Sequence, residues 1–151
     1  MKELHGDLIS LALAGHFEVI VHGCNCFCTM GAGIAKAIRD HFPEAYAADL
    51  ATAPGDRGKL GGYSAATLIR EGRELTVVNA YSQYHFHGTG ILVDYKAVRR
   101  VFAAIAKDFR GKRIGYPKIG AGLAGGDWTI LAAIISEELA GEDHTLVLLH
   151  R

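Results

Sequence analysis

Two glycine-rich loops are the parts of this sequence best suited to binding chemistry. The first follows the apolar run 17–24, the second follows the apolar run 113–116, and each leads into a predicted helix. Glycine lets the backbone N–H groups of such a turn approach a ligand, and the start of a helix favours negative charge. In open α/β sheets, ligands bind beyond the carboxyl ends of the strands, where such loops meet. Two loops of this kind predict a pocket for a diphosphate.

Residues from both loops are expected to line this pocket. They are Gly31, Ala32, Gly33 and Ile34 from the first loop, and Gly120, Ala121, Gly122 and Leu123 from the second. Neither loop matches the triphosphate-binding pattern GxxxxGK[ST], and the first lacks the full GxGxxG spacing of a dinucleotide fold. No nearby pair of acidic residues indicates a magnesium site, so we expect no cofactor and no metal.

Polar side chains at the end of the run 17–24 are candidates for catalysis. His22 titrates near neutral pH, so it can act as a general acid or base, or donate to a phosphate. It equally suits a buried structural histidine. Cys24 lies two residues away and would point the same way on a strand, which leaves a Cys–His hydrolase as an alternative. Zinc held by Cys24, Cys26 and Cys28 is another, although their spacing is closer than in structural zinc sites.

Alternating strands and helices must position these loops. Strands are expected at 2–6, 17–24, 63–70, 75–81, 113–116 and 145–149, and helices at 8–14, 34–41, 43–50, 91–109 and 130–139. Asp7 and Asp127 are the predicted N-caps of the first and last helices. The segment 53–62 is expected to be a loop, and EGRE at 71–74 a hairpin turn. The alternation predicts a three-layer α/β/α sandwich with a mixed central sheet, built as one domain of residues 1–151.

The composition limits the classes of protein to which the chain can belong. Half of its 151 residues are apolar, which suits a compact domain. Sixteen basic and sixteen acidic residues cancel, which argues against nucleic acid or an anionic membrane as partner. No apolar run approaches the roughly 20 residues of a membrane-spanning helix, and MKELHGDLIS does not read as a secretory signal. Three cysteines within five positions do not suggest disulfides, so we expect a cytoplasmic protein.

Three segments, in this order, resemble a macro domain: GDLISLA, HGCNCFCTMGAGIAKAIRDHFPEA and YPKIGAGLAGGDW. Macro domains are ADP-ribose-binding α/β/α modules of about this length. The sequence is most similar to the branch with ADP-ribose 1″-phosphate phosphatases and terminal ADP-ribose glycohydrolases. The resemblance implies that ADP-ribose, or an ADP-ribosylated substrate, is the partner. It also implies that Asp7 accepts a hydrogen bond from adenine with Leu8 beside it, that Asn25 meets the distal ribose, and that the two loops hold the diphosphate.

Two positions depart from the hydrolase pattern of this branch. Gln83 stands where enzymes that cleave ADP-ribose from glutamate or DNA carry a reactive lysine, and Ala124 stands where the glutamate-specific enzymes carry an acid. A glutamine amide can hydrogen-bond a ligand but cannot form a Schiff base, which disfavours the lysine-dependent reaction. His85 and His87 follow in the same loop and are candidates for covering the ribose end.

We therefore predict a protein that binds ADP-ribose and hydrolyses a derivative of it, with dephosphorylation of ADP-ribose 1″-phosphate as the favoured reaction. His22 would protonate the leaving oxygen or activate water, and Asn25 would fix the distal ribose. Lys118 is a candidate for facing a terminal phosphate. The alternatives are a glycohydrolase that removes ADP-ribose from protein or nucleic acid, and a non-catalytic ADP-ribose reader.

Overall fold

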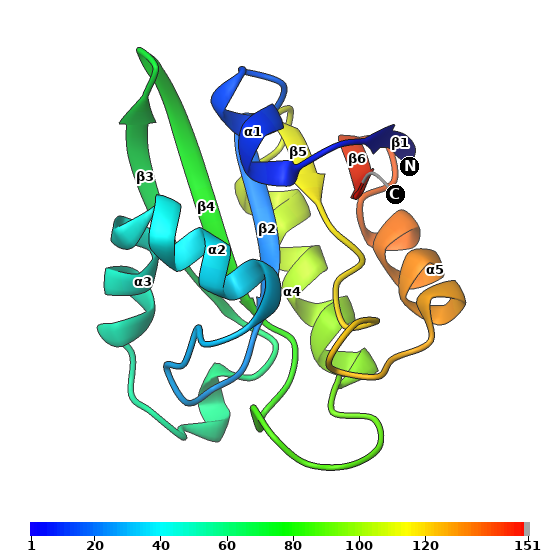
Figure 1. Ribbon diagram of the computed structural model, residues 1–151. Coiled ribbons are helices and arrows are strands. Elements are labelled where there is room, and N and C mark those ends of the chain that lie inside the picture. The colour runs from blue at the N-terminus through cyan, green and yellow to red at the C-terminus, as the bar shows by residue number, and fades with distance from the viewer. Residues whose placement is uncertain (150–151) are drawn as a thin grey trace.

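A six-stranded sheet runs through the middle of the molecule in the order β1-β6-β5-β2-β4-β3 (Figure 1). The computed structural model describes residues 1–149, so residues 150 and 151 of the predicted domain lie outside the described part. The strands are β1 (Lys2–His5), β2 (Val19–Cys24), β3 (Tyr63–Arg70), β4 (Arg73–Tyr81), β5 (Arg113–Tyr116) and β6 (Asp143–Leu148). All neighbours are parallel except β3, which is antiparallel to β4. The mixed sheet is therefore confirmed.

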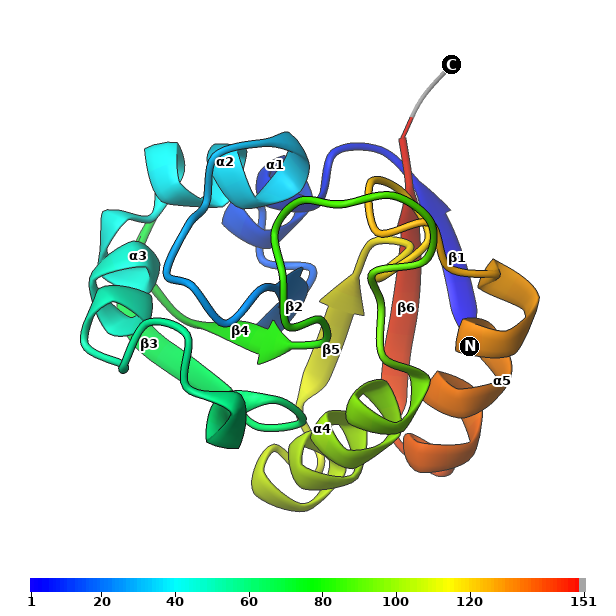
Figure 2. The same cartoon turned by 90° about the horizontal axis from the view of Figure 1, so that it is seen from below.

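Helices cover both faces of the sheet and complete the predicted three layers (Figures 1 and 2). One face carries α1 (Leu8–Leu13), α2 (Gly33–His41) and α3 (Pro43–Leu50), and the other carries α4 (Tyr95–Asp108) and α5 (Trp128–Glu138). A short 3₁₀ helix, η1 (Arg57–Lys59), interrupts the loop after α3. None of the helices in residues 1–149 has the length and hydropathy needed to cross a membrane.

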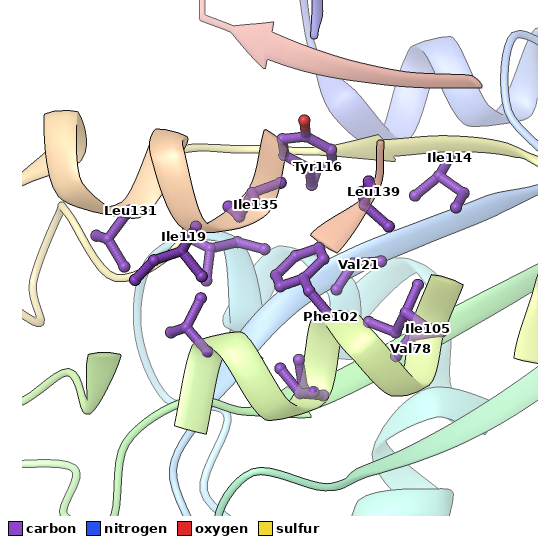
Figure 3. Packing of buried hydrophobic residues seen from close by; sticks show 14 of the residues in the cluster. Val21, Val78, Phe102, Ile105, Ile114, Tyr116, Ile119, Leu131, Ile135 and Leu139 are labelled. Carbon is purple, nitrogen blue, oxygen red and sulfur yellow. The ribbon is translucent and has the colours of Figure 1, made fainter. Parts of the chain in front are cut away.

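The core beneath α4 and α5 shows why these segments are helical. Val98, Val101, Phe102 and Ile105 recur at helical spacing in α4 and are all fully buried. Figure 3 shows Phe102 and Ile105 packed against strand residues from the sheet and against side chains of α5. Burial of this apolar stripe fixes α4 on the sheet, and α4 in turn fixes the loop that precedes it.

The hairpin between β3 and β4 is tighter than the predicted turn 71–74. Arg70 pairs with Arg73, so the connection consists of Glu71 and Gly72 alone. Their φ angles are 54° and 74°, as in a two-residue type I′ turn, whose twist matches that of the flanking strands. The prediction was wrong for residues 73 and 74, which belong to β4, because glutamate is an uncommon residue at the first position of such a turn.

The helix predicted from residue 91 begins only at Tyr95. Asp94 caps it by accepting a hydrogen bond from the Ala97 amide at 3.0 Å. Val93 instead forms an isolated antiparallel bridge with Gln83, and the Leu92 amide donates to the Ala124 carbonyl at 2.8 Å. These apolar residues therefore tie the loop before α4 to the second glycine loop. The elements predicted at 43–50, 63–70 and 113–116 have the observed bounds, and the remaining ones differ by one or two residues at an end.

Candidate functional site

A cavity of about 460 Å³ lies beyond the carboxyl ends of β2 and β5. Figure 2 looks onto this end of the molecule, where the loops after β2, β4 and β5 gather. Predicted residues from all three loops line the cavity: Asn25, Gly31, Ala32, Gly33, Ile34, Gln83, Gly120, Gly122 and Leu123. The two glycine loops thus meet around one space, as expected from the sequence, and their role in binding stays a prediction.

The first glycine loop presents the start of α2 to the cavity. Ala32 is the N-cap residue of α2 and supplies no side-chain hydrogen bond, whereas Asp7, Asp94 and Asp127 cap α1, α4 and α5 with their carboxylates. The first N–H groups of α2 therefore depend on an acceptor from outside the helix. Gly33 has a φ of 59°, which glycine adopts without strain. Uncapped amides at a helix start are well suited to an anion.

The second glycine loop contains glycines of two kinds. A Cβ atom at Gly120 would lie 2.6 Å from Val93 Cγ2, and one at Gly126 would lie 2.6 Å from the Gly120 carbonyl oxygen, so both positions serve the packing of the loop. At Gly122, by contrast, a Cβ atom would meet nothing within 4 Å, and the same holds for Gly31 in the first loop. A side chain at Gly122 or Gly31 would project into the open space beside the cavity.

Asn25 shapes the loop that joins β2 to α2. Its Oδ1 accepts from the Phe27 amide at 2.8 Å, and its Nδ2 donates to the Thr29 hydroxyl at 2.8 Å and to the Thr29 carbonyl at 3.1 Å. Both ends of the amide are thus engaged within the loop, while the residue still lines the cavity. The side chain holds the wall in place on the side where the resemblance puts the distal ribose.

His22 lies behind the cavity wall, between the sheet and α3. It is completely buried, and its Nε2 lies 2.7 Å from Asn79 Oδ1. Asn79 Nδ2 donates to the Ala45 carbonyl of α3 and to Ser64 Oγ, which leaves Oδ1 as an acceptor and places the proton of His22 on Nε2. Burial lowers the pKa of His22 to about 4, so the imidazole is neutral at neutral pH. His22 is not among the residues that line the cavity, so the structure gives no support to its predicted catalytic role. The alternative, a buried structural histidine, fits this geometry.

The hydrogen bonds of His22 continue into a set of buried polar side chains that we call the α3 network. Ser64 Oγ lies 2.7 Å from Tyr81 Oη, and Tyr81 Oη donates to Asp49 Oδ1 at 2.7 Å. Burial raises the pKa of the Asp49 carboxyl, and the hydrogen bond from Tyr81 opposes that rise. The members of the α3 network are His22, Asn79, Ser64, Tyr81 and Asp49.

Cys24 is close to His22 but is not arranged as a nucleophile. Its Sγ lies 3.6 Å from Nε2 and 3.7 Å from Nδ1. A sulfur that is almost equally far from both ring nitrogens does not lie along the hydrogen-bonding direction of either one. Burial raises the pKa of the Cys24 thiol, which keeps it protonated. Cys26 and Cys28 donate to backbone carbonyls instead. Within residues 1–149, no three side chains that could ligate a metal ion come together.

Phe86, rather than the histidines on either side of it, lines the cavity. His85 stacks on Phe27 with ring centroids 5.5 Å apart, and His87 packs edge-on against Phe86 at 4.6 Å. Phe27 also packs against Tyr84 at 5.0 Å. His85 and His87 were predicted to cover the ribose end, whereas it is the apolar residue between them that lines the cavity.

Gln83 and Lys118 are polar side chains of the cavity wall that carry candidate roles. Gln83 occupies the position of the expected lysine, and its Nε2 donates to the His85 carbonyl at 2.7 Å. Lys118 is exposed and is the basic side chain of the described wall. Further wall residues were not predicted as binding residues, although most adjoin the glycine loops: Gly23, Thr29, Ala35, Phe86, Pro117 and Ile119.

Several predicted residues lie outside the cavity wall. Asp7 caps α1, as the sequence indicated: its Oδ2 accepts from both the amide and the hydroxyl of Ser10 at 2.8 Å. Leu8 is buried beside it, and Ala121 packs against the core. Asp127 caps α5 by accepting from the Thr129 amide at 2.9 Å. The adenine-binding role of Asp7 stays a prediction.

The sequence has a relative along most of its length. An uncharacterized 17.5 kDa protein in the tk-vs intergenic region of Enterobacteria phage T4 is 34% identical over 140 residues, which cover 89% of this chain and 87% of that protein. An ADP-ribose 1″-phosphate phosphatase of Aspergillus oryzae is 41% identical over 46 residues, which cover 30% of this chain and 21% of the phosphatase. No protein-family model matches the chain.

Solved structures share the whole fold. The macrodomain of Thermus aquaticus DarG has a TM-score of 0.75 and 21% identity, covering 97% of this chain and 96% of that one. Thermosipho africanus DarTG, solved in complex with ADP-ribose, has a TM-score of 0.72 and 14% identity, covering 98% of this chain and 42% of that one. At these identities the likeness is one of fold.

Proposed function

We propose that the chain, which has the fold of the macrodomains, binds ADP-ribose in the cavity between its two glycine loops. The observation that carries the proposal is the pair of loops that face each other with unused backbone donors. On one side these are the first amides of α2, which no side chain caps. On the other, the described residues supply no acceptor for the amides of Gly122 and Leu123. Two such sets suit the two phosphates of ADP-ribose.

The rest of the ligand follows from this placement of the diphosphate. The distal ribose would lie over Asn25 and Gln83, at the end of the cavity where β2 and β4 finish. Adenine would lie toward α1, where the carboxylate of Asp7 can accept from its amino group. Both hydrogen bonds from Ser10 end on Asp7 Oδ2, so capping of α1 and recognition of adenine use different oxygens.

We propose further that the protein hydrolyses ADP-ribose 1″-phosphate, with water as co-reactant and ADP-ribose and inorganic phosphate as products. The match to a phosphatase of that name supports this, as does the glutamine in place of the reactive lysine. Lys118, which lines the cavity, would offset the charge of a terminal phosphate. Asn25 contributes by holding the wall, whereas His22 acts on stability through the α3 network.

A non-catalytic ADP-ribose reader is the second candidate, and one observation favours it. The described cavity wall contains two titratable side chains, Cys24 and Lys118. Burial raises the pKa of the Cys24 thiol, so it is not poised to exchange a proton near neutral pH. A described wall that contains no histidine or carboxylate can bind a ligand without turning it over.

One experiment separates these functions. The protein is incubated in parallel with ADP-ribose 1″-phosphate, an ADP-ribosyl-glutamate peptide and ADP-ribosylated DNA, while calorimetry measures ADP-ribose binding. We expect binding, and release of phosphate from the first substrate alone. Binding without product from any substrate would identify a reader. Release of ADP-ribose from the peptide or the DNA would identify a glycohydrolase that works without the lysine.

A further inference from the structure

Ser82 carries a buried hydroxyl that the protein itself does not use. The residue follows the last residue of β4 and is 1% exposed, and its Oγ has no hydrogen-bond partner among the described residues. Its backbone is held on both sides: the amide donates to the Cys24 carbonyl at 3.2 Å, and the carbonyl accepts from the Asp94 amide at 2.8 Å. The position of the hydroxyl is therefore set by the end of β2 and the start of α4.

The Ser82 hydroxyl lies directly behind the cavity wall. A Cβ atom at Gly23 would be 2.7 Å from Ser82 Oγ and 3.2 Å from Ile119 Cγ2. Gly23 and Ile119 both line the cavity, and Figure 3 shows Ile119 among the buried residues of the core. Glycine at position 23 thus lets this hydroxyl pack directly against the backbone of a residue that lines the cavity. The next residue, Gln83, lies in the wall itself.

The two unpartnered buried side-chain atoms of the described residues differ in their surroundings. Asp49 Oδ2 belongs to the α3 network, and the other oxygen of that carboxylate accepts from Tyr81. Ser82 Oγ lies on the opposite side of the sheet end, against residues that line the cavity. A buried polar group without a partner opposes folding, so its retention at a cavity suggests that a ligand satisfies it.

We propose that the Ser82 hydroxyl is a further ligand-binding group, which turns toward the cavity when a ligand binds and contacts the distal ribose through one shared water. The proposal rests on the proposed function, because it assumes that ADP-ribose occupies the cavity with its distal ribose at the β2–β4 end. Sugar hydroxyls both donate and accept hydrogen bonds, as does serine, so either partner can satisfy the other. The contact would favour ligands that carry the distal ribose over ligands that end at the diphosphate.

Calorimetry with ADP-ribose and with ADP, which lacks the distal ribose, tests this contact in Ser82→Ala. We expect ADP-ribose binding to weaken by roughly three- to tenfold and ADP binding to change by less than about twofold. The free variant should melt at the parent temperature or above, because removing an unused buried hydroxyl costs the fold nothing. Ser82→Cys, which keeps most of the volume, should lose the same preference for ADP-ribose.

Ser64→Ala is the matched control. The Ser64 hydroxyl bonds to Tyr81 Oη and Asn79 Nδ2, so its loss should lower the melting temperature by roughly 2–8 °C and leave the ratio of the two affinities unchanged. Unchanged ADP-ribose affinity in Ser82→Ala and Ser82→Cys would overturn the proposal, as would equal losses for both ligands. A lower melting temperature in free Ser82→Ala would show that the hydroxyl serves the fold. If the parent binds neither ligand, the proposed function itself fails.

Discussion

The cavity and the α3 network lie side by side at the end of the sheet, and they differ in how far their polar groups are hydrogen-bonded within the protein. In the α3 network, His22 hydrogen-bonds to Asn79, Ser64 to Tyr81 and Tyr81 to Asp49, and among the described buried side-chain atoms of this network only Asp49 Oδ2 has no partner. In the cavity, the amides at the start of α2 and at Gly122 have no such partners among the described residues. Polar groups that satisfy one another stabilise a fold, whereas oriented groups left unsatisfied are available to a ligand. We therefore expect the α3 network to contribute to stability and the cavity to contribute to binding.

A side chain introduced into the cavity should produce the largest effect on ADP-ribose binding. We expect Gly122→Glu to weaken ADP-ribose binding more than about a hundredfold, because the new side chain enters the diphosphate space and repels the phosphates. A Cβ atom here meets nothing within 4 Å, and the residue has no positive φ, so the fold should tolerate the change. Calorimetry measures the affinity, and a thermal melt of the free protein measures the fold.

Gly122→Gln is the control for charge, since it has nearly the same shape as Gly122→Glu. It should weaken binding by an intermediate factor, through bulk alone. Parent-like ADP-ribose affinity in Gly122→Glu would remove the second glycine loop from the binding site.

Changes in the α3 network should instead alter the free energy of unfolding, and this effect should depend on pH. Burial lowers the pKa of His22 to about 4, whereas the unfolded chain takes up this proton at the ordinary value near 6.5. The unfolded state therefore binds more protons between these values, so stability is full above about pH 6.5 and falls toward pH 4. The loss from His22 alone amounts to about 3 kcal/mol. Urea unfolding between pH 7.5 and 4.5 should show a shallower pH slope in His22→Gln than in the parent.

His22→Gln also tests the catalytic role predicted from the sequence. If the α3 network is structural, the folded variant keeps ADP-ribose affinity and any phosphatase rate at pH 7.5. A folded variant with parent-like stability but a rate lowered by a factor of 10² or more would place His22 in the mechanism after all.

The sequence predicted the layers and the meeting of the two loops, because these depend on local signals. Apolar periodicity marked α4, and glycines after strands marked the loops of Gly31 and Gly122. His22 could not be placed in the same way. It is three residues from Asn25, yet it points toward α3, and only the pairing of β2 with β4 puts Asn79 opposite it. The position of Ser82 could not be predicted either, because it depends on a contact with Gly23, which belongs to a neighbouring strand.

Adenine recognition should show a smaller effect, confined to Asp7. Asp7→Ser keeps a side chain that can cap α1 and removes the carboxylate. We expect ADP-ribose affinity to fall roughly ten- to a hundredfold, because a charged acceptor is lost, while ribose 5-phosphate affinity stays within about twofold. Asp127→Ser, which changes the cap of α5 in the same way, should alter neither affinity. Equal losses for both ligands would mean that Asp7 serves only as the cap.

A change at Lys118, where the cavity is open to solvent, should have the smallest effect on ligand affinity. The side chain lines the cavity but is exposed, so its attraction to an anion is screened by water and salt. We expect Lys118→Met to weaken ADP-ribose 1″-phosphate about two- to fivefold at low salt, and to have less effect in 0.5 M salt, on the order expected for exposed ion pairs. ADP-ribose, which lacks the terminal phosphate, should be less affected. An equal loss for the two ligands would place the ammonium group at the diphosphate instead of the terminal phosphate. The difference between the two ligands therefore tests whether Lys118 contacts the terminal phosphate of ADP-ribose 1″-phosphate.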